Sequence, residues 1–240
     1  MKILGHRGIR QDENINKPYQ NTIEAINFAI KNNADGVEID VFASLDKICF
    51  VIHDDEIKIH NGGDIKITSS NSKIIDLQRI GKPNNIYKIP KLSELFEYFS
   101  VRKNKILNIE IKQNGISELV YKEIKNSKIL KDNLIISSFN HSDLISFRQL
   151  DKNIKIGLLF TSDDAEKEGY FEYIENLSDK LGNTIFIPNC YTKNEKILNS
   201  EREKYFWTIK EKEIENGLFD SLKKLPNANF ITDFPELIKR

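Results

Sequence analysis

The sequence has little of what marks membrane-spanning, secreted or disulfide-bonded proteins. It contains two cysteines in 240 residues, Cys49 and Cys190, and they lack the close spacing of a metal-binding pair. No segment approaches the roughly 18 consecutive apolar residues that span a membrane. The apolar start of the chain ends at Gly5, too soon for the apolar region of a signal peptide. We therefore expect two buried free thiols, no stable membrane anchoring and a cytoplasmic location.

An excess of charge of either sign is also missing, because 36 basic residues balance 36 acidic residues. Nucleic acids and anionic membranes attract proteins through a net positive field and the release of counterions. The sequence therefore predicts no nucleic-acid partner, and any charged partner must be recognised by a local group of residues. Internal repeats, low-complexity segments and linkers are absent as well, which predicts a single domain over residues 1–240.

Residues 36–54 form two extended apolar segments joined by a polar turn at residues 44–47. So short a connection can join only antiparallel neighbours. Glu38 and Asp40 lie two residues apart in the first segment, so the strand repeat places both carboxylates on one face. The returning segment brings His53 opposite them. The pattern predicts a β-hairpin on which two carboxylates and an imidazole meet.

Apolar strands and amphipathic helices alternate along most of the chain. A first strand ends at Gly5, Thr22 is the expected N-cap of a helix, and Pro90 is expected to start another. Further strands are predicted at 106–111, 133–138, 155–160, 184–188, 204–209 and 229–233, and helices at 115–127, 141–151, 163–181, 192–202, 212–224 and from Pro235. These strands are apolar on both faces, as in a parallel sheet covered by helices. Eight β/α units in this length predict an α/β fold, the closed (β/α)8 TIM barrel, with an open doubly wound sheet as the alternative.

Residues 55–88 interrupt this alternation. Turn-forming residues there surround short β-like runs such as 65–67. We interpret the segment as a short insertion after the hairpin extension of strand two, with one small hairpin of its own. Long excursions on an α/β scaffold usually shape the site, so we expect it to lie over the active-site rim.

Polar residues end several of the predicted strands, and the C-terminal ends of barrel strands meet at one rim. They are His6, Arg7, Glu38, Asp40, His53, Glu110, Lys112, Ser138, Trp207 and Asp233. Three carboxylates buried together would repel one another, and a divalent cation removes that repulsion. Oxygen ligands suit Mg²⁺ or Ca²⁺, and the sequence has no cysteine or paired-histidine set for zinc.

Arg7 and Lys112 on the same rim favour an anionic ligand, because a guanidinium and an ammonium together are typical of phosphate sites. His6 and His53 can supply a general acid and a general base on either side of a phosphorus atom. These residues predict a metal-assisted phosphodiesterase with a small-molecule phosphodiester substrate. His60 and His141 are interpreted as structural, the second as a helix N-cap.

The same residues occur in the order of a known family pattern. The matching segments are His6-Arg7-Gly8, Gln20-Asn21-Thr22, Glu38-Ile39-Asp40, His53-Asp54 and Glu110-Ile111-Lys112, with weaker matches at Ser137-Ser138-Phe139, Trp207-Thr208-Ile209 and Ile231-Thr232-Asp233-Phe234-Pro235. Over nearly its whole length the sequence resembles the glycerophosphodiester phosphodiesterases, of the phosphatidylinositol-phospholipase-C-like phosphodiesterase superfamily.

The resemblance implies a (β/α)8 barrel that hydrolyses a glycerophosphodiester to glycerol 3-phosphate and an alcohol, a reaction of lipid metabolism. It also implies three kinds of role: metal ligands Glu38, Asp40 and Glu110; acid and base His6 and His53; and substrate contacts Arg7, Lys112 and Trp207. The metal would be Mg²⁺ or Ca²⁺. Which histidine is the acid is left open.

Two departures and two alternatives accompany this interpretation. Gln20 stands where the family has Glu, which removes a negative charge near the expected metal, and Lys210 stands where Asn is usual. One alternative is a phospholipase D-like or sphingomyelinase D-like hydrolase of lysolipids, which would need an exposed apolar patch around the rim. The other is a non-catalytic barrel that binds phosphodiesters.

Overall fold

A barrel of eight parallel strands forms the centre of the computed structural model, which describes residues 1–240 except 12–13, 15, 61, 83–84 and 239–240. The strands are β1 (Ile3–Gly5), β2 (Gly36–Ala43), β8 (Ile106–Ile111), β9 (Leu134–Ser138), β10 (Lys155–Phe160), β11 (Thr184–Pro188), β12 (Lys204–Ile209) and β13 (Ala228–Thr232). Strand β1 pairs with both β13 and β2, which closes the sheet on itself. The predicted (β/α)8 barrel is confirmed, and the open sheet is excluded.

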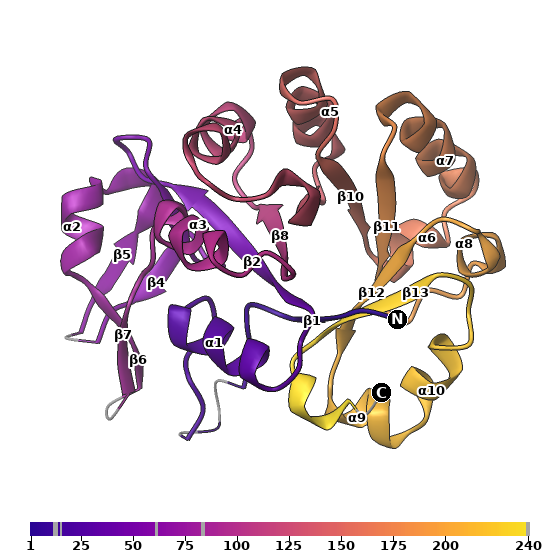
Figure 1. The fold of residues 1–240 in the computed structure, drawn as a ribbon, viewed down its shortest axis with the longest axis horizontal. Coiled ribbons are helices and arrows are strands. Elements are labelled where there is room, and N and C mark those ends of the chain that lie inside the picture. Colours follow the sequence, from indigo (N-terminus) through magenta and orange to yellow (C-terminus); the bar gives the residue numbers. More distant parts are fainter. Residues whose placement is uncertain (12–13, 15, 61, 83–84, 239–240) are drawn as a thin grey trace.

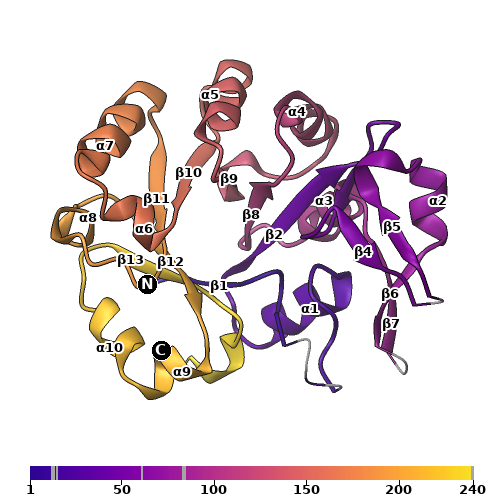
Figure 2. The same ribbon diagram turned by 180° about the vertical axis from the view of Figure 1, so that it is seen from behind.

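Helices surround the strands as a ring in both views of the molecule (Figures 1 and 2). They are α1 (Ile23–Lys31), α3 (Leu92–Ser100), α4 (Ser117–Asn126), α5 (His141–Leu150), α6 (Ser162–Ala165), α7 (Tyr170–Leu181), α8 (Glu195–Asn199), α9 (Glu211–Glu215) and α10 (Leu218–Leu222), with 3-10 turns η2 (Lys131–Asn133) and η3 (Pro235–Leu237). The side chain of Thr22 accepts a hydrogen bond from the Ala25 N–H, so the predicted N-cap of α1 is confirmed.

Four helix predictions need correction. The segments 163–181 and 212–224 are each two helices, because Gly169 and Gly217 have φ values of 74° and 80°, which a continuing helix does not allow. Asn140 and not His141 is the N-cap of α5, since its short side chain accepts a hydrogen bond from the Ser142 N–H. Helix α3 begins at Leu92, two residues later than the predicted start at Pro90.

Apolar side chains fill two layers, one between the strands and the helices and one inside the barrel. Val37, Ile39 and Val41 of β2 belong to the outer layer, together with apolar residues of α1, α3 and α4. Leu4, Ile135, Ile185, Tyr205 and Ile231 form the inner layer. Strands β2 and β8 differ from the others, because their inward positions carry Glu38, Asp40, Asn108 and Glu110. The barrel interior is therefore apolar on one side and polar on the other.

Strand β3 (Cys49–Val51) runs back antiparallel to β2, with Val41 opposite Val51 and Ala43 opposite Cys49. The Ile52 N–H donates to the Asp40 carbonyl over 3.0 Å, which carries the pairing on toward His53. Both cysteines are buried free thiols, as predicted. Every helix among the described residues is too short or too polar to cross a membrane.

Residues 55–88 are more regular than the sequence predicts. They form two hairpins, β4 (Glu56–Lys58) with β5 (Asp64–Lys66) and β6 (Arg79–Lys82) with β7 (Asn85–Lys88), together with η1 (Ile67–Ser69) and α2 (Ser72–Leu77). In Figure 1 they lie at one edge of the molecule beside α3. Isoleucines from this segment pack on Phe50 and Ile52 in a small core. Each strand is only three or four residues long, too short for a clear alternating pattern in the sequence. Packing on Phe50 and Ile52 therefore determines the structure of the segment.

Gly36 begins β2, where the backbone of β8 lies so close that a Cβ atom would overlap the carbonyl group of Ile106. We expect Gly36→Ala to lower the free energy of unfolding by about 3 kcal/mol, because paired strands in a closed barrel cannot separate to make room. Gly169→Ala is the control, since a Cβ there meets nothing within 4 Å and only the backbone strain of about 1 kcal/mol remains. Urea denaturation of both variants measures the difference, and equal losses would contradict the steric explanation.

Candidate functional site

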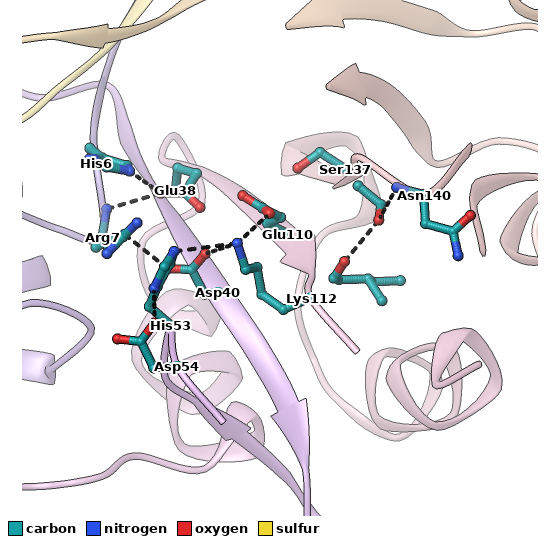
Figure 3. Close-up of polar contacts among 12 residues, drawn as sticks. His6, Arg7, Glu38, Asp40, His53, Asp54, Glu110, Lys112, Ser137 and Asn140 are labelled. Atoms are coloured by element: carbon teal, nitrogen blue, oxygen red, sulfur yellow. Dashed lines mark hydrogen bonds and ion pairs between the residues drawn. The ribbon is translucent and has the colours of Figure 1, made fainter. Parts of the chain in front are cut away.

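Three carboxylates meet inside the barrel, on the polar side formed by β2 and β8. Asp40 is paired with Glu110 across the two strands, and Glu38 is paired with Asn108 two residues earlier. One carboxylate oxygen from each of Glu38, Asp40 and Glu110 lies within 4.8 Å of the other two. Figure 3 shows the three side chains pointing toward one another. The strand register therefore makes the cluster that the sequence predicts.

The three carboxylates are almost fully buried and influence one another's protonation. Burial, together with the charges of Asp40 and Glu110, raises the pKa of Glu38 well above its usual value. Burial and the Asp40 charge raise the pKa of Glu110 to about 7. Burial also acts to raise the pKa of Asp40, but Arg7, His53 and Lys112 outweigh it and hold that pKa below its usual value. In the metal-free protein, the surroundings of the cluster therefore disfavour the simultaneous ionisation of all three carboxylates.

Two basic side chains flank the cluster from opposite sides (Figure 3). The Arg7 Nε lies 3.2 Å from Asp40 Oδ2, while its backbone N–H donates to Glu38 Oε2 over 3.0 Å. Arg7 Nη1 donates to the Gln20 side chain over 2.7 Å, so the residue that departs from the family pattern orients this arginine. Lys112 Nζ lies 3.1 Å from Glu110 Oε1 and 4.0 Å from Asp40 Oδ1. Both cations can therefore reach an anion placed at the cluster.

A hard divalent cation fits this donor set. Glu38 Oε1 is buried and has no hydrogen-bond partner among the described residues, which is costly for a carboxylate oxygen. All the converging donors are carboxylate oxygens, the ligand type that Mg²⁺ and Ca²⁺ prefer. A bound cation would supply the missing partner and offset the mutual repulsion.

Two histidines lie at this site, each held by a carboxylate. His6 Nδ1 donates to Asp233 Oδ1 over 2.6 Å, and its Nε2 lies 4.0 Å from Glu38 Oε2. His53 Nδ1 lies 2.7 Å from Asp54 Oδ1, and its Nε2 lies 3.3 Å from Lys112 Nζ. Burial lowers the pKa of both imidazoles, more than the nearby carboxylates raise it. In both residues the Nε2 atom faces the cluster and is able to exchange a proton there.

A cavity of about 250 Å³ joins these groups. Its walls are formed by His6, Arg7, Glu38, His53, Asn108, Glu110, Lys112, Phe139, Leu159, Trp207 and Ile231. The Trp207 indole N–H donates to the Ile187 carbonyl over 3.0 Å, and Phe139 packs edge-on against the indole ring. None of the described residues between 55 and 88 lines this cavity. Cover of the rim by that segment stays a prediction.

Sequence reasoning left four contributors to the site without a role. Asp233 was recognisable only as a polar residue near a strand end, but it holds His6. Asn21 lies within a matching segment and donates to Asp40 Oδ2 over 2.8 Å. Asn108 and Phe139 line the cavity. Asn108 also carried a local signal, because it precedes Glu110 by two residues and so shares its face of β8.

Comparison with known proteins gives one consistent result. The model of the glycerophosphoryl diester phosphodiesterase family matches residues 6–237. A glycerophosphodiester phosphodiesterase of Caldanaerobacter subterraneus is 36% identical over 167 residues, which span 66% of each chain. One from Bacillus altitudinis is 31% identical over 169 residues, again 66% of each chain. These relatives are therefore matched over slightly less than two thirds of their length.

Solved structures match over more of the chain. The glycerophosphodiester phosphodiesterase of Thermotoga maritima superposes with a TM-score of 0.73 at 29% identity, covering 98% of this chain and 95% of that one. A phosphodiesterase of Oleispira antarctica, solved with the product sn-glycerol 3-phosphate, gives a TM-score of 0.79 at 23% identity, covering 98% and 94%. The second likeness supports the fold alone.

Replacing one of the clustered carboxylates should stabilise the metal-free protein. In Glu38→Gln the amide oxygen still accepts from the Arg7 N–H, while the amide nitrogen faces Asp40 and Glu110 without repulsion. We expect the free energy of unfolding in EDTA to rise by about 1 kcal/mol, or about 2–4 °C in thermal midpoint for a chain of this size.

Glu168→Gln, at an exposed position, is the control and should leave the midpoint unchanged. Added Mg²⁺ or Ca²⁺ should raise the midpoint of the wild type more than that of Glu38→Gln. A lower midpoint for Glu38→Gln in EDTA would contradict the repulsion described above.

Proposed function

The chain belongs to the glycerophosphoryl diester phosphodiesterase family of phosphoric diester hydrolases, and on that basis we propose that it hydrolyses a glycerophosphodiester to glycerol 3-phosphate and an alcohol. One observation carries the proposal within this chain. Two imidazoles, each held at Nδ1 by a carboxylate, face an acidic cluster that two basic side chains flank. A purely structural role would not call for three buried carboxylates and two imidazoles around one cavity.

The substrate phosphate lies between Arg7 and Lys112 in this proposal. Both cations already contact the acidic cluster, and both line the cavity. Glu38, Asp40 and Glu110 would hold a divalent metal ion, Mg²⁺ or Ca²⁺, which when bound supplies positive charge next to a phosphoryl oxygen. The carbon atoms of the substrate pack against the apolar wall, where Trp207 is the contact that the sequence predicts.

His6 and His53 carry the proton transfers. One Nε2 removes the proton from the attacking oxygen, supplied by water or by a hydroxyl of the glycerol, as that oxygen forms a bond to phosphorus. The other Nε2 gives a proton to the alcohol oxygen as its bond to phosphorus breaks. Asp233 and Asp54 accept from the Nδ1 N–H groups, and so stabilise whichever imidazole is charged.

The lysolipid and non-catalytic alternatives receive less support. Among the described residues, the large apolar side chains with the greatest exposure include Leu77, Leu45 and Val101, and none of these three lines the cavity. Phe139 lines the cavity and is 40% exposed, which alone is no extended lipid-binding patch. Both histidines and all three carboxylates are in place, which favours turnover over binding alone.

The proposal is tested by release of glycerol 3-phosphate from glycerophosphocholine, with Mg²⁺ or Ca²⁺ and with EDTA. We expect EDTA to abolish the release, and His6→Ala and His53→Ala each to lower kcat by about 10² to 10⁴, because each removes one proton carrier. His60→Ala is the matched control, since that side chain is exposed and lies outside the cavity. Lysophosphatidylcholine is measured in parallel. Undiminished activity in both histidine variants, or faster turnover of the lysolipid, would overturn the proposal.

The carboxylate that contacts each histidine Nδ1 should contribute to kcat in proportion to how deeply it is buried. The Asp233 side chain is 4% exposed and that of Asp54 is 66% exposed, so solvent screens the second interaction far more. We expect Asp233→Asn to lower kcat at least about 10-fold with little change in KM, and Asp54→Asn to have a smaller effect. Steady-state kinetics on glycerophosphocholine measures both. Equal effects of the two substitutions would contradict this ranking.

A further inference from the structure

Asn108 lines the cavity one strand layer below Asp40 and Glu110, at the level of Glu38. Asn108 and Glu110 are two residues apart on β8, Lys112 directly follows that strand, and all three line the cavity. Two residues of strand correspond to about 7 Å, so Asn108 lies that much farther from the rim than Glu110. Lys112 Nζ reaches back to the level of the Glu110 carboxylate. A ligand held at that level extends toward Asn108.

The carboxamide of Asn108 has one end fixed and the other end without a partner. The Ser137 hydroxyl donates to Asn108 Oδ1 over 2.8 Å, which sets the orientation of the amide. The Nδ2 atom is buried and, among the described residues, makes no hydrogen bond. The side chain is fully buried, and an unsatisfied buried donor costs about 1–3 kcal/mol. Such a donor in a cavity wall points to a ligand oxygen as its partner.

The surroundings of Asn108 select the kind of oxygen. Glu38 occupies the paired position on β2, and its buried Oε1 is an acceptor without a partner among the described residues. An anionic oxygen at this level would accept from Asn108 but would be repelled by Glu38. A hydroxyl group accepts from the amide and donates to the carboxylate, whose oxygen keeps a second lone pair for a metal ion. The pair therefore suits a neutral hydroxyl.

We propose that Asn108 Nδ2 donates a hydrogen bond to the terminal hydroxyl of the glycerol part of the substrate, making Asn108 a specificity-determining residue. The assignment rests on the proposed function, because the phosphate position fixes which end of the glycerol reaches Asn108. With phosphorus between Arg7 and Lys112, the hydroxyl farthest from phosphorus reaches deepest. The cavity then favours substrates whose alcohol part is glycerol over substrates whose alcohol part is a diol that ends in a methyl group.

The test compares glycerophosphocholine with the matching phosphodiester of propane-1,2-diol, which keeps the middle hydroxyl and lacks the terminal one. We expect the wild type to favour the glycerol compound at least about 10-fold in kcat/KM. A substrate without the terminal hydroxyl leaves the buried Asn108 donor unpaired. Asn108→Ala has no donor to leave unpaired, so this preference should fall toward 1. The ratio is measured within each variant, which removes any general loss of activity from the comparison.

Two serine variants complete the design. Ser137→Ala removes the hydroxyl that orients the amide and should lower the preference part of the way, which keeps the assignment testable if Asn108→Ala does not fold. Ser138→Ala is the matched control, because its buried hydroxyl donates to the Ile111 carbonyl and the residue does not line the cavity. The control should keep the wild-type preference.

An unchanged preference in both Asn108→Ala and Ser137→Ala would overturn the assignment. So would an equal loss of kcat/KM on both substrates in Asn108→Ala, since the donor would then serve the phosphate or the fold. These outcomes leave hydrolysis by the wild type intact and do not touch the proposed function. Absence of hydrolysis of any glycerophosphodiester by the metal-supplied wild type would instead overturn the proposed function.

Discussion

Mutual repulsion among Glu38, Asp40 and Glu110 is the constraint on which the rest of the site depends. The strand pairing holds the three carboxylates within 4.8 Å of one another inside the barrel, where water cannot screen them. Arg7 and Lys112 offset part of that charge, and a hard cation suits the remainder. The arrangement costs stability, and a closed barrel with apolar layers on both sides of its strands can sustain such a cost.

The barrel divides its interior between stability and chemistry. Inward positions on β1, β9, β10, β11, β12 and β13 carry the apolar side chains of the inner layer. Inward positions on β2 and β8 carry the polar ones. One wall of the cavity therefore suits carbon atoms, while the other suits a phosphate and hydroxyl groups. A small polar phosphodiester matches both walls, and both histidines line the same cavity.

Family membership and the chain's own residues support the function in different ways. Membership gives the reaction class, because the family model covers residues 6–237. The residues of this chain give the finer arrangement around the cavity. Gln20 still orients Arg7 although it replaces an acidic residue, and Asn108 adds a fixed donor beside Glu38.

The sequence by itself determined the barrel strands, the pairing of β2 with its returning segment and the cluster of three carboxylates, because strand periodicity and strand ends are local signals. Strand β8 was predicted with its observed ends, Ile106 and Ile111. Only the tertiary structure decided that Asp233 holds His6, since 227 residues separate them. It also decided the regular hairpins and helix within residues 55–88, whose apolar side chains pack on Phe50. Finally, it left Asn108 Nδ2 without a hydrogen-bond partner among the described residues, because satisfaction of a buried donor depends on neighbours that other strands contribute.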